Sequence, residues 1–231
     1  MCGRATSTTS RDQLADLLGV DEVDAPELPA NWNVAPTQDI YVAATASSGE
    51  RKLRALKWGL VPHWSKDPRI GSKLINARAE TVTEKPAFRS SVRSKRGLVP
   101  FDGFYEWWRP EAGVKAHKQP YYFRATSGAP LALAALYDLW HDAEGKPWRT
   151  VALITTAANA TMAPVHNRMP VILPAEVWDE WLSPWPIEPH RRTQLLAPAP
   201  DDLLERYPVS TAVNSAKNNG PELVEPLALT A

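Results

Sequence analysis

Residues 131–140 read LALAALYDLW, an almost wholly apolar run just past the middle of a chain of 231 residues. Short apolar runs between turn-forming residues are typical of largely buried strands. The pattern recurs along the chain, so we expect several such strands. They are predicted at 131–140, 97–101, 121–124 and 151–155, with further strand-like segments at 39–44 and 52–58.

A short helix is expected near the N-terminus. Ser10 and Gln13 have the spacing of a capping box, in which each side chain bonds the main chain of the other. Leucines at 14, 17 and 18 supply an apolar stripe, and Gly19 is a natural stop. Further short helices are predicted at 77–85, before Pro86, and at 175–182 and 201–207.

Strands outnumber helices and do not alternate strictly with them, which argues against a doubly wound parallel sheet. We therefore expect an α+β fold, with a mixed, mainly antiparallel sheet forming an irregular barrel-like core and short helices at its periphery. The chain shows no internal repeat and no convincing linker. One domain is expected at 2–225, followed by a C-terminal tail at 226–231, and residues 109–119 and 183–200 are predicted to be surface loops.

The composition excludes several classes of protein. Basic and acidic side chains number 26 each, so the formal net charge is zero and no overall field attracts polyanions. A nucleic-acid site must therefore be a local patch. The single cysteine excludes an internal disulfide. No apolar run approaches the roughly 18 residues needed to span a bilayer, and the N-terminus lacks the order of a signal peptide, so we expect a cytoplasmic protein away from membranes.

The sequence also lacks the spacing of metal ligands, a phosphate-binding glycine motif and a GxSxG elbow. We therefore expect no metal and no cofactor. The chain is rich in proline, with 22 residues, and in tryptophan, with 10. Tryptophan serves in protein cores and also as a platform on which unpaired bases stack.

Cys2 is the only cysteine and follows the initiator Met1 directly. If Met1 is removed, the α-amine and thiol of Cys2 form a 1,2-aminothiol. An α-amine titrates at about pH 8, so a fraction of it is nucleophilic at neutral pH. Such a pair reacts with aldehydes, since the amine forms an imine and the thiol then closes a five-membered thiazolidine ring. The alternative is a frayed terminus without a role.

Other polar residues stand in apolar contexts, where burial costs free energy unless the group is paired or used. Glu106 is flanked by aromatic residues that would desolvate it and suit it to proton transfer; alternatively it lies on the wet face of a strand. His166 is bracketed by Pro164 and Pro170, which fix its direction, or is a packing or surface residue. Asn76 follows an apolar pair and either contacts a substrate or caps a helix.

Two polar segments are open to alternatives. Residues 213–220 combine amide side chains and Lys217 with a glycine turn, and they either bind phosphate or form a simple turn. Residues 90–96 are predicted to be a charged surface loop. Several cations are candidates for a local basic patch, namely Arg4, Arg78, Arg89, Arg93, Lys95, Arg96 and Arg168.

Several short motifs follow one another along the chain. They are Met1-Cys2-Gly3-Arg4, Asn33-Val34-Ala35-Pro36-Thr37, Trp58-Gly59-Leu60-Val61-Pro62, Ile75-Asn76-Ala77-Arg78-Ala79-Glu80-Thr81, Asp102-Gly103-Phe104-Tyr105-Glu106-Trp107, His166-Asn167-Arg168-Met169-Pro170, and Val213-Asn214 with Asn218-Asn219. In order and spacing, these motifs resemble the SOS response-associated peptidase family over essentially residues 2–225. Each motif is weak alone, but together they are highly specific.

The resemblance implies recognition of an abasic site in single-stranded DNA, with a thiazolidine formed between the N-terminal cysteine and the ring-opened sugar. Cys2 would be the nucleophile and Asn76 would position the sugar or the Cys2 amine. Glu106 would shuttle protons, and His166 would assist ring opening or reversal. The resemblance further implies self-removal of Met1, possible lyase activity, and a monomer that joins the nucleoid during DNA damage.

The resemblance also implies contacts to DNA. Arg78 and Arg168 would grip the flanking phosphates, and Trp107 and Phe88 would stack or wedge beside the lesion. Arg4, Asn33 and Trp64 complete the expected contacts. The chain departs from the family pattern in two places. His63-Trp64-Ser65 stands where some members have two consecutive tryptophans, and Pro86 replaces a basic contact of some relatives, with Lys85 or Arg89 as substitutes.

Two other functions compete with this hypothesis. In one, Cys2 is the nucleophile of an amidohydrolase or peptidase, with His166 as base and Asn76 in an oxyanion hole. In the other, the chain is a non-catalytic module whose Trp and Arg residues bind single strands. The first predicts turnover of an amide without a DNA adduct, and the second predicts binding that is indifferent to loss of Cys2.

Overall fold

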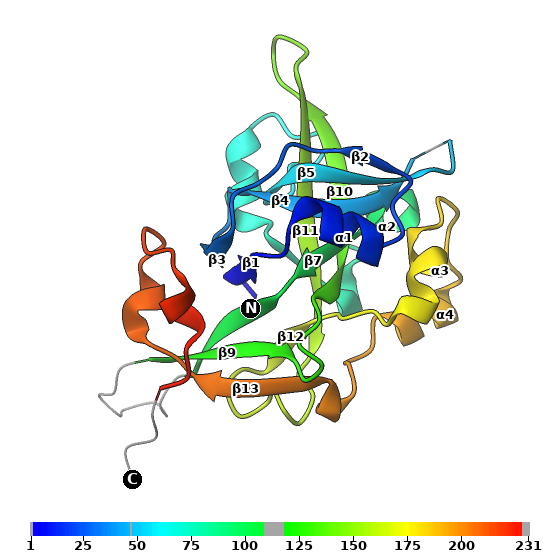
Figure 1. Cartoon of the computed structure of the whole chain (residues 1–231). Coiled ribbons are helices and arrows are strands. Elements are labelled where there is room, and N and C mark those ends of the chain that lie inside the picture. The colour runs from blue at the N-terminus through cyan, green and yellow to red at the C-terminus, as the bar shows by residue number, and fades with distance from the viewer. Residues whose placement is uncertain (1, 47, 109–117, 228–231) are drawn as a thin grey trace.

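The computed structural model describes residues 2–46, 48–108 and 118–227. Its centre is a closed barrel of strands in the order β11 (Pro147–Ala157), β10 (Leu131–His141), β7 (Arg96–Phe101), β4 (Asp39–Thr45) and β5 (Arg51–Trp58) (Figure 1). Neighbouring strands are antiparallel, and a parallel pairing of β5 with β11 closes the barrel. The prediction of a mixed, mainly antiparallel α+β barrel is confirmed.

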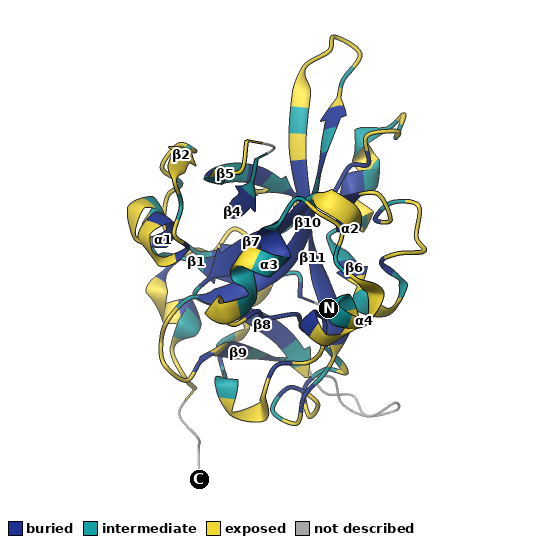
Figure 2. Ribbon diagram, turned by 90° about the vertical axis from the view of Figure 1, so that its right-hand side faces the viewer, coloured by how far each residue is buried: buried dark blue, intermediate teal, exposed yellow. Residues whose placement is uncertain are grey.

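Alternation of side chains along the barrel strands separates an inner from an outer core. On β10, Leu131, Leu133 and Ala135 belong to a cluster to which every barrel strand contributes, so this cluster fills the lumen. The residues between them point outward into a second cluster that includes helical side chains such as Leu14 and Trp181. Both faces of β4, of β7 and of the central parts of β10 and β11 are therefore buried, which explains their continuous apolar sequences, whereas β5 buries only Leu53, Leu56 and Trp58. Figure 2 shows β7 and much of β11 as buried.

A second, antiparallel sheet lies beside the barrel (Figure 1). Its strand order is β13 (Leu204–Pro208), β9 (Gln119–Ala125), β8 (Gly103–Trp108), β1 (Ala5–Ser7) and β3 (Asn31–Val34). Only Asp102 separates β7 from β8, so the chain passes directly from the barrel into this sheet. Three short strands flank the barrel: β2 (Glu22–Asp24) pairs with β5, and β6 (Asn76–Arg78) and β12 (Arg168–Pro170) pair with β11.

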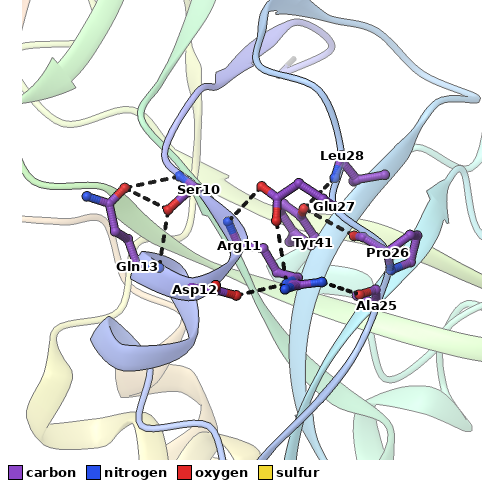
Figure 3. A network of polar contacts seen from close by, with 9 residues as sticks. All are labelled: Ser10, Arg11, Asp12, Gln13, Ala25, Pro26, Glu27, Leu28 and Tyr41. Atoms are coloured by element: carbon purple, nitrogen blue, oxygen red, sulfur yellow. Dashed lines mark hydrogen bonds and ion pairs between the residues drawn. The ribbon is translucent and has the colours of Figure 1, made fainter.

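Helix α1 (Arg11–Leu17) begins with the expected capping box. The Ser10 side chain accepts from the Gln13 N–H, and the Gln13 side chain accepts from the Ser10 N–H (Figure 3). Arg11 extends the network to Asp12, to Glu27 and to the main-chain carbonyl of Ala25. These contacts attach the helix to the strand-connecting segment that follows β2, so a local sequence signal also produces a tertiary contact.

The other helices are short. They are α2 (Ser91–Ser94), α3 (Trp178–Leu182) and α4 (Pro189–Leu195), with 3-10 helices at Pro68–Lys73, Ala79–Thr81, Ala175–Val177, Asp201–Leu203, Thr211–Asn214 and Pro221–Val224. The predicted helical region at 175–182 is thus a 3-10 turn followed by α3. Across the described residues, we find no helix with the length and apolar character needed to traverse a membrane.

Two predicted helices are wrong. At 77–85 the chain completes β6, which runs parallel to β11, and then makes a single 3-10 turn. At 201–207 a 3-10 turn leads into β13, which pairs with β9. In both places a strand distant in sequence supplies main-chain hydrogen-bond partners. Tertiary pairing of this kind overrides local helix preference.

The predicted loops also differ from the structure. Residues 90–96 form α2 and the start of β7, and Arg96 is 2% exposed because its guanidinium donates to the carbonyls of Trp181 and Trp185. The predicted loop at 183–200 contains α4. Of 109–119, residues 109–117 lie outside the described part, and Gln119 begins β9.

The connection from β5 to β6 is closed by two glycines. Gly59 has φ +129°, and a Cβ atom there would lie 2.6 Å from the carbonyl oxygen of Gly71. Only glycine tolerates both this conformation and this approach. The Gly59 N–H also donates to the Val151 carbonyl at 2.8 Å. The loop that exposes Trp64 and leads into β6 is therefore anchored to the barrel.

The end of the described chain is attached to the second sheet. Pro226 pairs with Val209, and the Leu227 N–H donates to the Pro208 carbonyl at 2.9 Å. The predicted tail at 226–231 thus begins with two residues held by hydrogen bonding, and residues 228–231 lie outside the described part.

Candidate active site

Cys2 is buried immediately before β1, with 1% of its surface exposed. It belongs to the lumenal cluster, which also includes Phe101 and Phe104. Burial raises the pKa of the Cys2 thiol, the charge of Glu106 raises it further, and the Arg4 main-chain N–H acts in the opposite direction. The thiol is therefore protonated at neutral pH. This packing excludes a frayed terminus, and the predicted role of Cys2 as a nucleophile stays a prediction.

Asn76 is held next to Cys2 by its strand. As the first residue of β6, it lies opposite Leu153 of β11. Its side-chain Nδ2 donates to the main-chain carbonyl of Cys2 at 2.8 Å. Its Oδ1 is buried and has no hydrogen-bond partner among the described residues. The helix-cap alternative is wrong, because Asn76 lies in a strand and the next 3-10 turn follows Arg78 without a side-chain cap.

Glu106 approaches Cys2 from the second sheet. It lies on β8 opposite Tyr121 of β9 and is 4% exposed, so the wet-face alternative is wrong. The negative charge of its carboxylate contributes to the raised pKa of the Cys2 thiol. The structure therefore brings together Cys2 from the N-terminal segment, Asn76 from β6 and Glu106 from β8.

His166 and Arg168 lie at the start of β12. The Nδ1 atom of His166 accepts from the Arg168 main-chain N–H at 2.9 Å. The Arg168 guanidinium donates to both carboxylate oxygens of Glu80, at 2.5 and 2.9 Å, and to the Thr155 carbonyl at 2.6 Å. The hydrogen bonds from Arg168 lower the pKa of Glu80. Arg168 is thus engaged in an ion pair rather than presented freely to a phosphate.

Arg78 is the last residue of β6, which pairs with the opposite edge of β11 from β12. Its partner in the strand register is Thr155, the residue whose carbonyl receives Arg168. The Arg78 side chain is exposed, and its charge acts on Glu80. The C-terminal part of β11 therefore carries both predicted phosphate contacts, one on each neighbouring strand.

Arg4 and Asn33 form a hydrogen-bonded support. The Arg4 Nη1 atom donates to the Asn33 side chain and to the Val213 carbonyl, both at 2.7 Å. Asn33 is 1% exposed and donates to the carbonyls of Ser215 and Asn218 at 2.9 and 2.8 Å. The hydrogen-bonding groups of Asn33 are used inside the protein, and its contact with DNA stays a prediction. Burial lowers the pKa of Arg4.

The same support orients Trp107. Its Nε1 donates to the Asn214 side chain at 2.6 Å, and the Arg4 guanidinium lies 5.9 Å from its ring centroid. The amides of 213–220 bond the protein, since Asn218 donates to the Ala212 carbonyl and Asn219 accepts from the Trp32 N–H, both at 2.8 Å. These contacts favour the turn alternative for 213–220 over a phosphate site.

The other two predicted aromatic contacts differ in exposure. Phe88 is 6% exposed and packs in the outer core cluster, so its ring is not presented as a wedge. Trp64 is 51% exposed. It borders a surface hollow of about 750 Å³ whose lining includes Lys66, Arg69 and Lys73. Trp64 therefore combines an open ring with nearby cations.

The predicted basic patch is smaller than the sequence suggested. Arg96 is buried, and Lys95 donates to the buried Asp138 at 2.5 Å. Arg78, Arg89 and Arg93 are exposed. Within the described ranges, no group of three or more His, Cys, Asp or Glu side chains has an arrangement that would hold a metal ion.

Sequence patterns missed two residues that shape the site. Asp102 accepts from the Thr8 N–H and hydroxyl, at 2.5 and 2.9 Å, and so attaches the chain after β1 to the junction of β7 and β8. Asp138 on β10 accepts from the His63 N–H at 2.9 Å and from its ring Nδ1 at 3.0 Å, next to Trp64. Asp138 is the one charged residue in the apolar run at 131–140, and this pattern indicates a buried carboxylate that needs partners.

Comparison with known proteins agrees with these observations. The family model described as SOS response associated peptidase (SRAP) matches residues 1–216. The chain belongs to the SRAP family. This confirms the resemblance found in the sequence motifs. An SRAP relative from Bacillus subtilis, abasic site processing protein YoqW, is 43% identical over 226 residues, covering 97% of this chain and 99% of the relative.

More distant SRAP relatives also align along the whole chain. Abasic site processing protein YedK from Escherichia coli is 30% identical, covering 98% of this chain and 100% of the relative. Abasic site processing protein HMCES from Xenopus tropicalis is 29% identical, covering 100% of this chain and 79% of the relative. A crystal structure of a Bacteroides thetaiotaomicron protein has a TM-score of 0.85 and 26% identity, covering 98% of this chain and 100% of that one. The barrel and its accessory sheet are therefore a shared architecture.

Proposed function

We propose that this protein captures abasic sites in single-stranded DNA as a covalent thiazolidine adduct of Cys2, after Met1 has been removed. The observation that carries the proposal is the hydrogen bond of Asn76 to Cys2 beside the buried Glu106. The relatives named abasic site processing protein support the same class of lesion. We further propose that the protein acts as a cytoplasmic monomer that associates with damaged DNA.

The reaction starts at the α-amine, because an α-amine titrates at about pH 8 and is partly a neutral nucleophile at neutral pH. The amine adds to the C1 aldehyde of the ring-opened deoxyribose, and loss of one water molecule gives an imine. The thiol then adds to the imine carbon. A C–S bond forms and the thiol proton ends on the ring nitrogen. The products are a thiazolidine and one water molecule, so no oxidant or reductant is needed.

Three side chains support these steps. Glu106 receives and returns protons as the amine adds and water departs. Asn76 holds the Cys2 carbonyl, and its buried Oδ1 is available to a hydroxyl or amine of the reacting groups. His166 supplies a proton to the sugar ring oxygen during opening.

The DNA strand is held by local contacts, because the chain has no net charge. Arg78 is the exposed phosphate contact, and Arg168 joins it by sharing its guanidinium between Glu80 and a phosphate. Trp107, oriented by Asn214, stacks beside the lesion. Trp64 offers a second platform for an unpaired base.

The test is incubation of the purified protein with single-stranded DNA carrying one abasic site, followed by denaturation and gel analysis. We expect a band that resists heat and detergent. Cys2→Ala should leave at most an imine that borohydride traps, because the ring-closing thiol is gone. An uncleaved tag ahead of Cys2 should abolish both products, and the intact mass should lack Met1. A stable adduct from Cys2→Ala would falsify the thiazolidine mechanism.

The same experiment addresses the competing functions. A peptidase or amidohydrolase would turn over an amide substrate and give no DNA adduct. Its nucleophile would be the Cys2 thiolate, and burial of the thiol opposes formation of that thiolate. A non-catalytic binding module would retain the DNA equally well with and without Cys2, and no band would survive denaturation.

A further inference from the structure

The barrel has an opening with charged residues at its rim, away from Cys2. A cavity of about 230 Å³ lies among β4, β5, β10 and β11. Its apolar walls are Val42, Ala44, Leu56 and Leu139. Val42 and Leu56 also belong to the lumenal core, so the floor of the cavity is the packed interior of the barrel. Openings of β-barrels are common places for small-molecule sites.

This opening is separate from the candidate active site. Asn76, which bonds Cys2, lies opposite Leu153 of β11. Arg149, which lines the cavity, precedes Leu153 on the same strand. Because a strand rises about 3.3 Å per residue, the two positions are about 13 Å apart along β11. A ligand in the cavity therefore does not occupy the Cys2 site.

Two polar side chains at the cavity, Arg149 and Tyr137, have no hydrogen-bond partner among the described residues. Arg149 is exposed and makes no hydrogen bond or ion pair with any described residue. The Tyr137 hydroxyl likewise has no hydrogen-bond partner in the described chain. Burial raises the pKa of Tyr137, and the neighbouring Arg54 and Arg149 oppose that shift. The phenol is therefore a protonated donor at neutral pH, next to a free guanidinium.

Two further cations line the cavity, each with one carboxylate partner. Arg54 bonds Asp24 at 2.9 Å, and Lys95 bonds Asp138 at 2.5 Å. Asp138 is shared, since it also accepts from His63. With Arg149 unpaired, the rim carries an excess of positive charge and several unused N–H donors. Such a rim attracts an anion.

The size of the cavity restricts the ligand. Pockets for drug-sized ligands measure roughly 300–1,000 Å³, so a space of about 230 Å³ suits a ligand with a single ring rather than a complete nucleotide. We propose that this end of the barrel binds a small organic anion, with a ring-sized apolar body against Leu56 and Leu139 and a carboxylate between Tyr137 and Arg149.

The test uses the full-length protein and benzoate as the probe. Titration followed by amide NMR should show saturable shifts at Ala44, Tyr137, Leu139 and Arg149. Benzyl alcohol, which lacks the charge, and acetate, which lacks the ring, should each bind at least tenfold more weakly. For benzyl alcohol, the missing charged hydrogen bonds are worth about 1.5–3 kcal/mol, which corresponds to about tenfold or more in Kd. Acetate instead loses the apolar contact of the ring.

Variants assign the polar contacts. Arg149→Gln and Tyr137→Phe should each raise the Kd for benzoate at least fivefold while leaving the melting temperature nearly unchanged. Arg124→Gln is the matched control, because Arg124 pairs with Glu205 on the second sheet, and it should bind benzoate like the parent. Cys2→Ala should also bind normally, so the result is independent of the DNA reaction. Unsaturable shifts, shifts centred elsewhere, or an unaffected Arg149→Gln variant would overturn the proposal.

Discussion

The Asn76 side chain donates a hydrogen bond to the main-chain carbonyl of Cys2, with an N···O distance of 2.8 Å. This bond connects the N-terminal segment to β6, and β6 is in turn paired with β11 of the barrel. Cys2 is thus held in register with a rigid element. Precise placement of reacting groups contributes strongly to rate.

We expect Asn76→Asp to slow cross-linking to abasic DNA by at least about tenfold, the effect of losing one positioning hydrogen bond of about 1.4 kcal/mol. The substitution preserves the shape of the side chain but replaces the donor with an oxygen. A time course of adduct formation provides the measurement, with thermal unfolding run in parallel. A variant that reacts at the parental rate would show that this hydrogen bond does not position the nucleophile.

Glu106→Gln should slow adduct formation by about 10² or more, which is typical for loss of a general acid or base. The amide fills the same space but does not exchange protons. Glu205→Gln is the matched control, since Glu205 is a partly exposed residue paired with Arg124 on the second sheet. Equal rates for the two variants would make Glu106 a structural residue.

His166→Ala should change the rate of sugar opening or adduct reversal more than it changes binding. Affinity for an unreactive abasic analogue should stay within about threefold, because the imidazole acts in proton transfer. The control is His190→Ala on α4, where His190 contacts Gln194. If the analogue binds much more weakly to His166→Ala, the histidine is a contact or folding residue.

Trp107 should determine the preference for single strands. An aromatic ring beside the lesion occupies the space of a complementary base, so a continuous duplex should react much more slowly than a single strand. Trp107→Ala should reduce the difference. Trp185→Ala serves as the control, because Trp185 is 73% exposed and lies after α3. Equal rates on both substrates for the parent protein would refute this role.

Asp138 should make stability depend on pH. Burial alone would raise its pKa, but hydrogen bonds from Lys95 and His63 outweigh that effect and hold the pKa below its usual range. A depressed carboxyl pKa stabilises the folded state above the unfolded value of about 3.9, and the contribution is lost as the pH falls through the folded pKa.

Asp138→Asn should therefore lower the free energy of unfolding by about 1.5–3 kcal/mol at pH 7, the range for hydrogen bonds to charged groups. The deficit should shrink at pH 3. Urea unfolding at the two pH values measures it, with Asp39→Asn as a control whose exposed carboxylate lies 3.7 Å from Lys57. A deficit that is constant with pH would show that the charge of Asp138 is not involved.

The barrel strands were predictable because their signal is local. The apolar runs that became β4, β7, β10 and β11 are largely buried on both faces, so apolar residues occupy most successive positions along them. The capping box at Ser10 and Gln13 was predictable for the same reason, since both partners lie within one turn of chain. In β6 and β13 the local sequence favours a helix, although the structure has strands there.

The family was predictable from the sequence motifs. A lone cysteine after Met1 defines a potential aminothiol in any fold, and the motif order identified the family. Exposure was not predictable, because it depends on which distant segments pack against a residue. Asn33 and Phe88 were expected to contact DNA, yet Asn33 supports Arg4 from inside and Phe88 packs in the outer core.

The sequence by itself determined the strand-rich α+β class, the N-terminal helix and the family, since these depend on local pattern and on the order of short motifs. Only the tertiary structure decided that β6 and β8 deliver Asn76 and Glu106 to Cys2. It also decided that Arg168 is bound to Glu80 and that Arg149 has no ion-pair partner among residues 2–46, 48–108 and 118–227. Hydrogen bonding, burial and charge pairing connect residues tens of positions apart, so their energies are set by the packing of the whole chain.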